Sequence, residues 1–224
     1  MSIKEKIEFK LLSRYKRKWN DEMLLLREKY ENTLPKYELE EKNFIGAELL
    51  LNRNQLLTRM PENAVCAEIG VDKGEFSKEI IFITKPTKLH LVDAWGDSNR
   101  YHDGLKVTVA EKFKSEIQKE QVEMNIGFST IVLNNFPDNY FDWVYLDTAH
   151  TYEITSEELS ILEKKMKLNG IIAGHDFTIC NWLGNFRYGV IEAVHEFCIK
   201  QNWKLIYLTA EVHQHRSFAI QKIK

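Results

Sequence analysis

Residues 64–77 read AVCAEIGVDKGEFS, and this stretch decides the fold class of the chain. Its apolar start is followed by two glycines, Gly70 and Gly74, in a G-x-x-x-G spacing. Glycines just past a strand let the backbone turn sharply and come close to a ligand. A second apolar run, residues 89–92, ends at Asp93, an acid placed to reach ribose hydroxyls. The pattern indicates a nucleoside-cofactor site, although glycines at strand ends are also ordinary turn residues.

Outward from this stretch, strand-like and helix-like segments alternate along the chain. Alternation of this kind predicts an α/β fold with a doubly wound, mostly parallel sheet of seven strands covered by helices. The last two strands are joined by a loop without a helix, which predicts an antiparallel hairpin at the sheet edge. Thr155 and Glu158 have the spacing of a capping box for one of the helices. The predicted strands are residues 64–69, 88–93, 121–126, 143–146, 171–173, 203–208 and 217–223, and the predicted helices are residues 74–83, 104–118, 129–134, 156–167 and 190–201.

The first 60 residues form a predicted helical extension, ahead of a domain at residues 61–224. Apolar residues recur every three or four positions up to Tyr30, which predicts one long amphipathic helix. Pro35 interrupts it, and a second helix is expected over residues 38–60. Residues 1–19 carry seven basic residues against two glutamates. The helix would pack on its own core or on a second copy as a homo-oligomer, or make a peripheral contact with an anionic membrane face or an acidic partner.

The composition is that of a folded chain with one core. It has 224 residues, of which 44% are hydrophobic and 29% charged, and the net charge of −2 argues against a general nucleic-acid binder. No apolar run approaches the ~20 residues that cross a bilayer, and no apolar segment follows the charged start, so a cytoplasmic protein is expected. Cys66, Cys180 and Cys198 contain no C-x-x-C and are expected as reduced core residues.

In open parallel sheets the ligand sits beyond the carboxyl ends of the strands, so the residues that end each predicted strand are the candidate site. Most of these strand-end residues are polar. In chain order they are Glu68 and Gly70, Asp93, Phe128 and Ser129, Asp147 and His150, and His175 and Asp176.

With these segments in order, residues 50–224 resemble the class I S-adenosylmethionine (SAM)-dependent methyltransferases. They are similar in particular to the small O-methyltransferases of the catechol and caffeoyl-CoA type and to bacterial sugar and antibiotic O-methyltransferases. The resemblance rests on EIGVDKG at 68–74, VD at 92–93, GFST at 127–130, FDWVYLDTAHTY at 141–152 and LNGIIAGHDF at 168–177. It implies SAM as the cofactor and methyl transfer to a hydroxyl of a small molecule or sugar.

The resemblance also assigns cofactor-binding roles to the residues at matching positions. The resemblance implies that Asp93 binds both ribose hydroxyls, that the backbone of Phe128 and the side chain of Ser129 hold the adenine, and that Glu68 lies near the cofactor's amino group. The glycine loop would face the methionine half. Asp93 as a strand-end cap and Ser129 as an ordinary helix N-cap are the alternatives.

The resemblance also suggests residues for a divalent metal site and for the general base. Metal-dependent relatives hold magnesium with an acid at the Asp147 position and with acidic or amide residues where this chain has His175 and Asp176. Imidazole in place of an oxygen ligand favours a softer divalent ion, or no metal. His150 stands where catechol-type relatives carry a lysine base, and an imidazole that is largely neutral at pH 7 can accept a proton. The other readings are that His150 ties its loop to a carboxylate, that it joins Asp147 and Asp176 as a metal ligand in place of His175, or that His175 is the base.

Two loops, residues 97–103 and 177–188, are expected to contact the substrate, the second as an aromatic mobile lid containing Trp182 or as a surface loop packed over the sheet edge. His213 and His215 are expected as plain loop residues. Two other classes stay open. One is an NAD-binding oxidoreductase, disfavoured because G-x-G-x-x-G is not found, and the other is a non-catalytic scaffold that holds a partner through its basic N-terminal helix. Nucleic-acid methylation is disfavoured by the overall charge.

Overall fold

The computed structural model describes residues 3–95 and 104–224, and contacts divide the chain into two units, Met1–Lys36 and Tyr37–Lys224. The first unit holds one helix, α1 (Ile3–Glu31), as the apolar periodicity predicts. None of the helices in the described residues has the length and apolar character that a membrane span requires.

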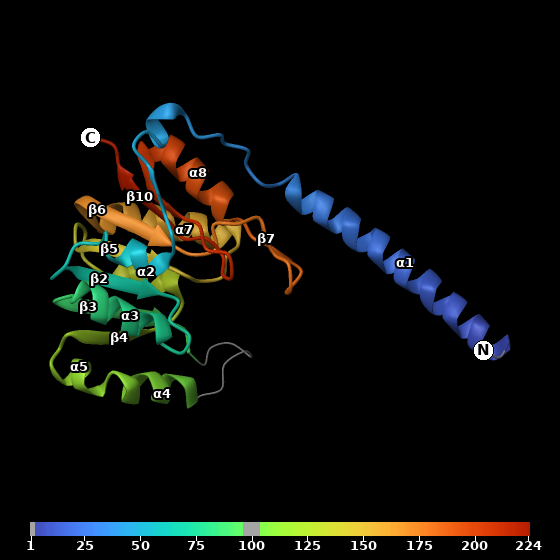
Figure 1. The fold of residues 1–224 in the computed structure, drawn as a ribbon, viewed down its shortest axis with the longest axis horizontal. Coiled ribbons are helices and arrows are strands. Elements are labelled where there is room, and N and C mark those ends of the chain that lie inside the picture. The colour runs from blue at the N-terminus through green and yellow to red at the C-terminus, as the bar shows by residue number, and fades with distance from the viewer. Residues whose placement is uncertain (1–2, 96–103) are drawn as a thin grey trace. The chain divides into compact units, whose positions relative to one another are not determined.

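The second unit is a sheet of eight strands between two layers of helices. The strands are β1 (Glu48–Leu50), β2 (Val65–Ile69), β3 (Lys88–Asp93), β4 (Val122–Ile126), β5 (Phe141–Leu146), β6 (Met166–Gly174), β9 (Trp203–Thr209) and β10 (Phe218–Lys222). The helices are α2 (Arg53–Leu57), α3 (Glu75–Thr84), α4 (Gly104–Lys112), α5 (Lys114–Gln118), α6 (Ser129–Val132), α7 (Tyr152–Lys165) and α8 (Val190–Gln201). The strand order is β1-β9-β10-β6-β5-β2-β3-β4, and β10 runs antiparallel to both of its neighbours while the other pairs are parallel (Figure 1). The predicted doubly wound α/β fold is thereby confirmed.

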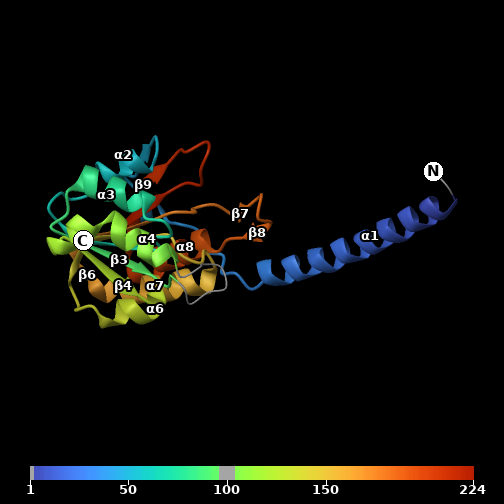
Figure 2. The ribbon, with the colours of Figure 1, turned by 90° about the horizontal axis from the view of Figure 1, so that it is seen from below.

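Each face of the sheet has its own hydrophobic core, because successive side chains of a strand point to opposite faces. In β5, Val144 packs into the core that holds α7 and α8, whereas Trp143 and Tyr145 pack into the core that holds α2 and α3. Figure 2 shows the strands between α3 on one side and α6 and α7 on the other. Burial of each such large side chain stabilises the fold by about 1.5–3 kcal/mol, which fixes the strand ends relative to one another.

The prediction of one helix over residues 38–60 is wrong. Glu41–Asn43 form one 3-10 turn, and the buried Asn43 amide donates to the carbonyl oxygens of Cys198 at 3.2 Å and Trp203 at 2.8 Å. Gly46 then takes a left-handed φ of 80°, and β1 pairs in parallel with β9. Hydrogen bonds to distant backbone outweigh local helix propensity here, and they add an eighth strand to the seven predicted.

The C-terminal hairpin forms, but it is not at the edge. β10 lies between β9 and β6, and β1 covers the outer side of β9. Two smaller predictions are also wrong. The α7 N-cap is Thr151, whose hydroxyl accepts from the Ile154 amide at 3.3 Å, so no capping box forms at Thr155. Cys180 is exposed rather than in the core.

Candidate functional site

The glycine loop between β2 and α3 lies against the end of β5. Gly70 has a left-handed φ of 90°, and a Cβ added there would lie 1.8 Å from the carbonyl oxygen of Asp147. Gly74, with φ of 71°, begins α3, and a Cβ there would lie 2.8 Å from the Phe113 ring. Only glycine fits either position without movement of its neighbours, so the loop backbone packs closely on the end of β5 at Gly70 and on the Phe113 ring at Gly74.

Asp93, at the end of β3, holds this loop in place. Its Oδ2 accepts hydrogen bonds from the backbone amides of Val71 at 2.8 Å and Asp72 at 2.9 Å, and its Oδ1 accepts from the amide of Trp95 at 3.0 Å. The strand-end cap is therefore present. A carboxylate has about four acceptor positions, so three amide donors leave capacity for a ligand hydroxyl.

Five of the predicted site residues line one cavity of about 920 Å³. They are Glu68, Gly70, Asp93, Asp147 and His150. They come from the ends of β2, β3 and β5, as the rule for open parallel sheets requires. The volume is in the range of sites that bind small molecules and cofactors.

Glu68 is a buried acid at the floor of this cavity. Burial raises its pKa to about 8, although the Ser77 hydroxyl donates to it and Arg53 lies nearby. Without a ligand the carboxyl is therefore largely protonated at neutral pH. An ammonium group placed beside it would favour the charged carboxylate.

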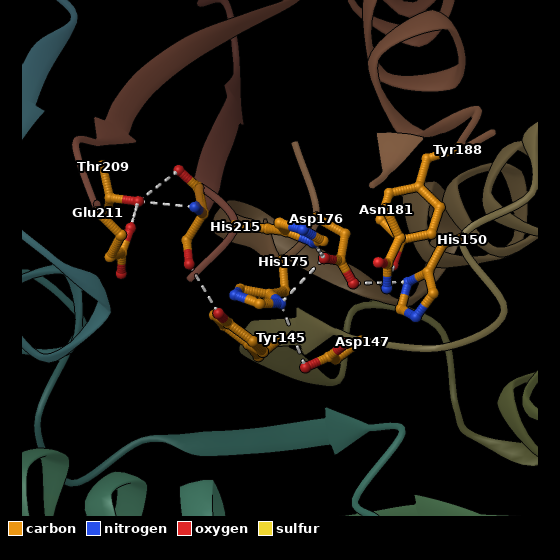
Figure 3. A network of polar contacts seen from close by, with 11 residues as sticks. Tyr145, Asp147, His150, His175, Asp176, Asn181, Tyr188, Thr209, Glu211 and His215 are labelled. Atoms are coloured by element: carbon orange, nitrogen blue, oxygen red, sulfur yellow. Dashed lines mark hydrogen bonds and ion pairs between the residues drawn. The ribbon is translucent and has the colours of Figure 1, made fainter. Parts of the chain in front are cut away.

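A cluster of one carboxylate and three imidazoles lies beside the cavity (Figure 3). The buried Asp176 is 3.0 Å from His150 Nδ1 through Oδ2 and 3.4 Å from His175 Nδ1 through Oδ1, and His215 Nδ1 also bonds to Oδ1. Burial acts to raise the pKa of Asp176, but its hydrogen bonds to His150 and His175 hold that pKa well below its usual range. Asp176 is thus an acceptor for all three rings. Both His150 and Asp176 have left-handed backbones, with φ of 59° and 56°, a conformation uncommon outside glycine.

Asp147 links this cluster to the cavity. Its Oδ2 lies 3.7 Å from His175 Nδ1, and one ligand atom from each of Asp147, His175 and Asp176 lies within 4.8 Å of the others. Burial raises the pKa of Asp147, with His175 opposing the rise. Burial lowers the pKa of His175, but Asp176 and Asp147 outweigh that effect and the net change is upward. His175 Nε2 is buried and has no partner among the described residues.

Phe128 and Ser129 lie apart from this cluster, at the start of α6. The Phe128 side chain is 52% exposed. The Ser129 hydroxyl donates to the buried Glu158, whose second oxygen accepts from Thr148 at 2.9 Å. The adenine-binding role of Phe128 and Ser129 stays a prediction.

Two residues at the site were missed by the sequence analysis. His215 was expected as a plain loop residue, yet it bonds to Asp176. Arg53 falls in the segment expected as a long helix, yet it lines the cavity. Nothing local distinguishes either residue, because each reaches the site only through the packing of β10 or α2.

Of the two predicted substrate loops, the second falls within the described residues. Residues 97–103 lie outside the described residues. Residues 177–188 contain a small hairpin of β7 (Cys180–Asn181) and β8 (Phe186–Arg187), with Trp182 87% exposed between the two strands. The role of this hairpin as a lid stays a prediction.

Comparison with known proteins gives the site a context. Residues 67–177 match the family described as a methyltransferase domain. A comparison with curated protein sequences found no match.

Solved structures share the fold at low sequence identity. The pyocyanin biosynthetic protein PhzM is 14% identical, with a TM-score of 0.58 over 77% of this chain and 55% of that protein, so this chain spans only about half of PhzM. A candidate methyltransferase from Streptococcus mutans, solved with SAH, is 13% identical, with a TM-score of 0.53 over 76% of this chain and 96% of that one. The tRNA methyltransferase TrmK from B. subtilis is 14% identical, with a TM-score of 0.54 over 78% of this chain and 67% of that one. Residues 67–177 thus match the methyltransferase-domain family, and the fold around them is shared with solved methyltransferase structures.

Proposed function

We propose that this chain transfers the methyl group of SAM to a hydroxyl of a small molecule or sugar, with His150 as the general base. The observation that carries the proposal is the shared cavity, where the glycine loop, Glu68 and Asp93 face Asp147 and His150. A cofactor held by the first group would have its sulfonium near the second. Alignment of acceptor oxygen, methyl carbon and sulfur can supply roughly 7–11 kcal/mol of the barrier in favourable cases.

The cofactor half of the proposal assigns one group to each part of SAM. Gly70 and Gly74 let the loop backbone approach the methionine half, and Glu68 receives its ammonium group. Asp93 would receive a ribose hydroxyl at its remaining acceptor position while it holds the loop; with three amides bound, it has room for one hydroxyl rather than the two that the resemblance implies. Phe128 and Ser129 would flank the adenine.

The pairing of His150 with Asp176 supports the role of His150 as the general base. His150 Nδ1 lies 3.0 Å from Asp176 Oδ2, and because Asp176 is held as a carboxylate, the pairing would place the ring proton on Nδ1 and leave the lone pair on Nε2. The acceptor oxygen would attack the methyl carbon, the carbon–sulfur bond would break with its electrons on sulfur, and the hydroxyl proton would pass to Nε2.

The same cluster offers a second means of activating the hydroxyl. Two carboxylates and an imidazole from Asp147, Asp176 and His175 fit a manganese, iron or zinc ion better than magnesium. When bound, such an ion would lower the proton affinity of the acceptor oxygen. In a thermal-shift assay, manganese or zinc should raise the melting temperature of wild type and of H213A but not of H175A. No shift in wild type would leave the histidine base as the sole activator.

Calorimetry with SAH and NAD, followed by transfer of labelled methyl from SAM to a panel of catechols and sugars, tests the function. The proposal expects SAH to bind and a hydroxyl to be methylated. Binding of NAD without SAH would support the oxidoreductase instead. SAH binding without any transfer to hydroxyl, amine or nucleic-acid acceptors would support the scaffold. We propose that the protein acts in the cytoplasm. We do not expect nucleic acid to be its methyl acceptor.

For partners, we propose self-association through α1. Leu12, Tyr15 and Trp19 are exposed. Residues 10–19 carry five basic side chains and no acid, whereas residues 20–31 carry four acids and two bases. Antiparallel pairing of two copies would set opposite charges against each other. Light scattering of the full chain should give a dimer that weakens with salt, and a monomer that binds anionic vesicles would support the membrane alternative.

A further inference from the structure

Arg53 lines the cavity, and its guanidinium forms no ion pair with any described residue. It is half-buried at the start of α2, and its guanidinium lies 4.5 Å above the Phe76 ring. Among the residues the structure describes, no carboxylate lies within ion-pair distance of it, and its guanidinium makes no hydrogen bond. An aromatic face uses none of the five N–H donors of a guanidinium, so the group keeps its full capacity to bind an anion.

Local structure holds Arg53 at the cavity. Asn52 caps α2 by accepting the Gln55 amide at 3.0 Å, and the buried Leu56 and Leu57 anchor the helix in the core beside α3. Because β1 runs parallel to its neighbour β9, α2 begins at the same edge of the sheet as the glycine loop. The guanidinium is thus positioned by the fold rather than swinging freely from a surface helix.

Five acids line the cavity, and four of them are engaged with other groups. Glu75 pairs with Lys78 and Lys112. Glu68 accepts the Ser77 hydroxyl, Asp93 accepts three backbone amides, and Asp147 faces His175. Acids lie near Arg53, but none of those described forms an ion pair with its guanidinium, so a ligand carboxylate could take up the free N–H donors.

We propose that Arg53 binds a carboxylate of a ligand in this cavity, through the paired N–H groups that match a carboxylate. The inference rests on the proposed function. Two ligands could supply the group, namely the methionine half of SAM and an acidic acceptor. Experiment separates them.

Calorimetry with matched ligands gives the first arm. SAH and its decarboxylated form, S-adenosyl-3-thiopropylamine, differ only in the carboxylate. If the cofactor supplies the group, R53Q should bind SAH about tenfold to a hundredfold more weakly than wild type, with no loss for the decarboxylated form. R53K, which keeps the charge but not the paired donors, should lose less, and it serves as the second variant should R53Q fold poorly. R59Q is the matched control, because Arg59 pairs with Glu48 at 2.9 Å on the surface.

The second arm titrates 3,4-dihydroxybenzoate and catechol into protein saturated with SAH. If the acceptor supplies the carboxylate, wild type should prefer the benzoate and R53Q should lose that preference while its affinity for SAH is unchanged. If R53Q and R53K match wild type for SAH and show no lost preference for the benzoate, the inference is refuted. Failure of wild type to bind any adenosyl ligand would instead refute the proposed function, and this inference with it.

Discussion

Replacing Gly70 with alanine tests the close approach of the glycine loop to β5. The added Cβ would lie 1.8 Å from the Asp147 carbonyl oxygen, where contacts under 3.0 Å are essentially never seen. That oxygen cannot retreat easily, because the Asp147 amide is held by the Ile69 carbonyl at 2.7 Å. Alanine at a left-handed φ costs about 1–2 kcal/mol, and overpacking adds about 1–3 kcal/mol. G70A should therefore lose about 2–5 kcal/mol of unfolding free energy.

Gly46 provides the matched control. Its φ of 80° is similarly left-handed, but a Cβ there would meet no described atom within 4 Å. G46A should lose only the conformational part, about 1–2 kcal/mol. Urea denaturation of both variants gives the comparison, and calorimetry should show weaker SAH binding for G70A alone. Equal losses in the two variants would refute the close-approach argument.

Three further predictions follow from the site. Asp93→Ala should weaken SAH binding at least about tenfold by calorimetry, since a ribose contact and the loop anchor are lost together, and unchanged affinity would remove the ribose role. His150→Ala should lower methyl transfer by about a hundredfold or more while SAH affinity stays within about twofold, with the exposed His213→Ala as control, and unaltered turnover would assign the base elsewhere. Burial raises the pKa of Glu158 from 4.5 to about 7, so the folded state keeps a proton that the unfolded state releases, and stability falls as pH rises through that window. Between pH 4.5 and 7, the free energy of unfolding of wild type should fall by about 3 kcal/mol more than that of Glu158→Gln, as measured by urea denaturation. The same pH dependence of unfolding free energy in both proteins would contradict the raised pKa of Glu158.

Much of the fold follows from features that are local in sequence. The alternation of strands and helices, the glycines after β2 and the acid after β3 each lie within a short stretch. In a parallel sheet such stretches deliver their ends to one edge, whatever the details of packing. For that reason the sequence alone predicts that the strand-end residues share a site. The structure confirms one cavity lined by Glu68, Gly70, Asp93, Asp147 and His150.

From residue 61 onward, local residue patterns therefore suffice to derive the order of most strands and helices and the residues at their ends. Which distant segments meet depends on tertiary packing. It turned a predicted helix into β1, set β10 inside the sheet, and brought His215 to Asp176 and Arg53 to the cavity. These contacts are chosen by burial and backbone pairing across the whole unit, and a local pattern of residue types carries no record of a partner far away in the chain.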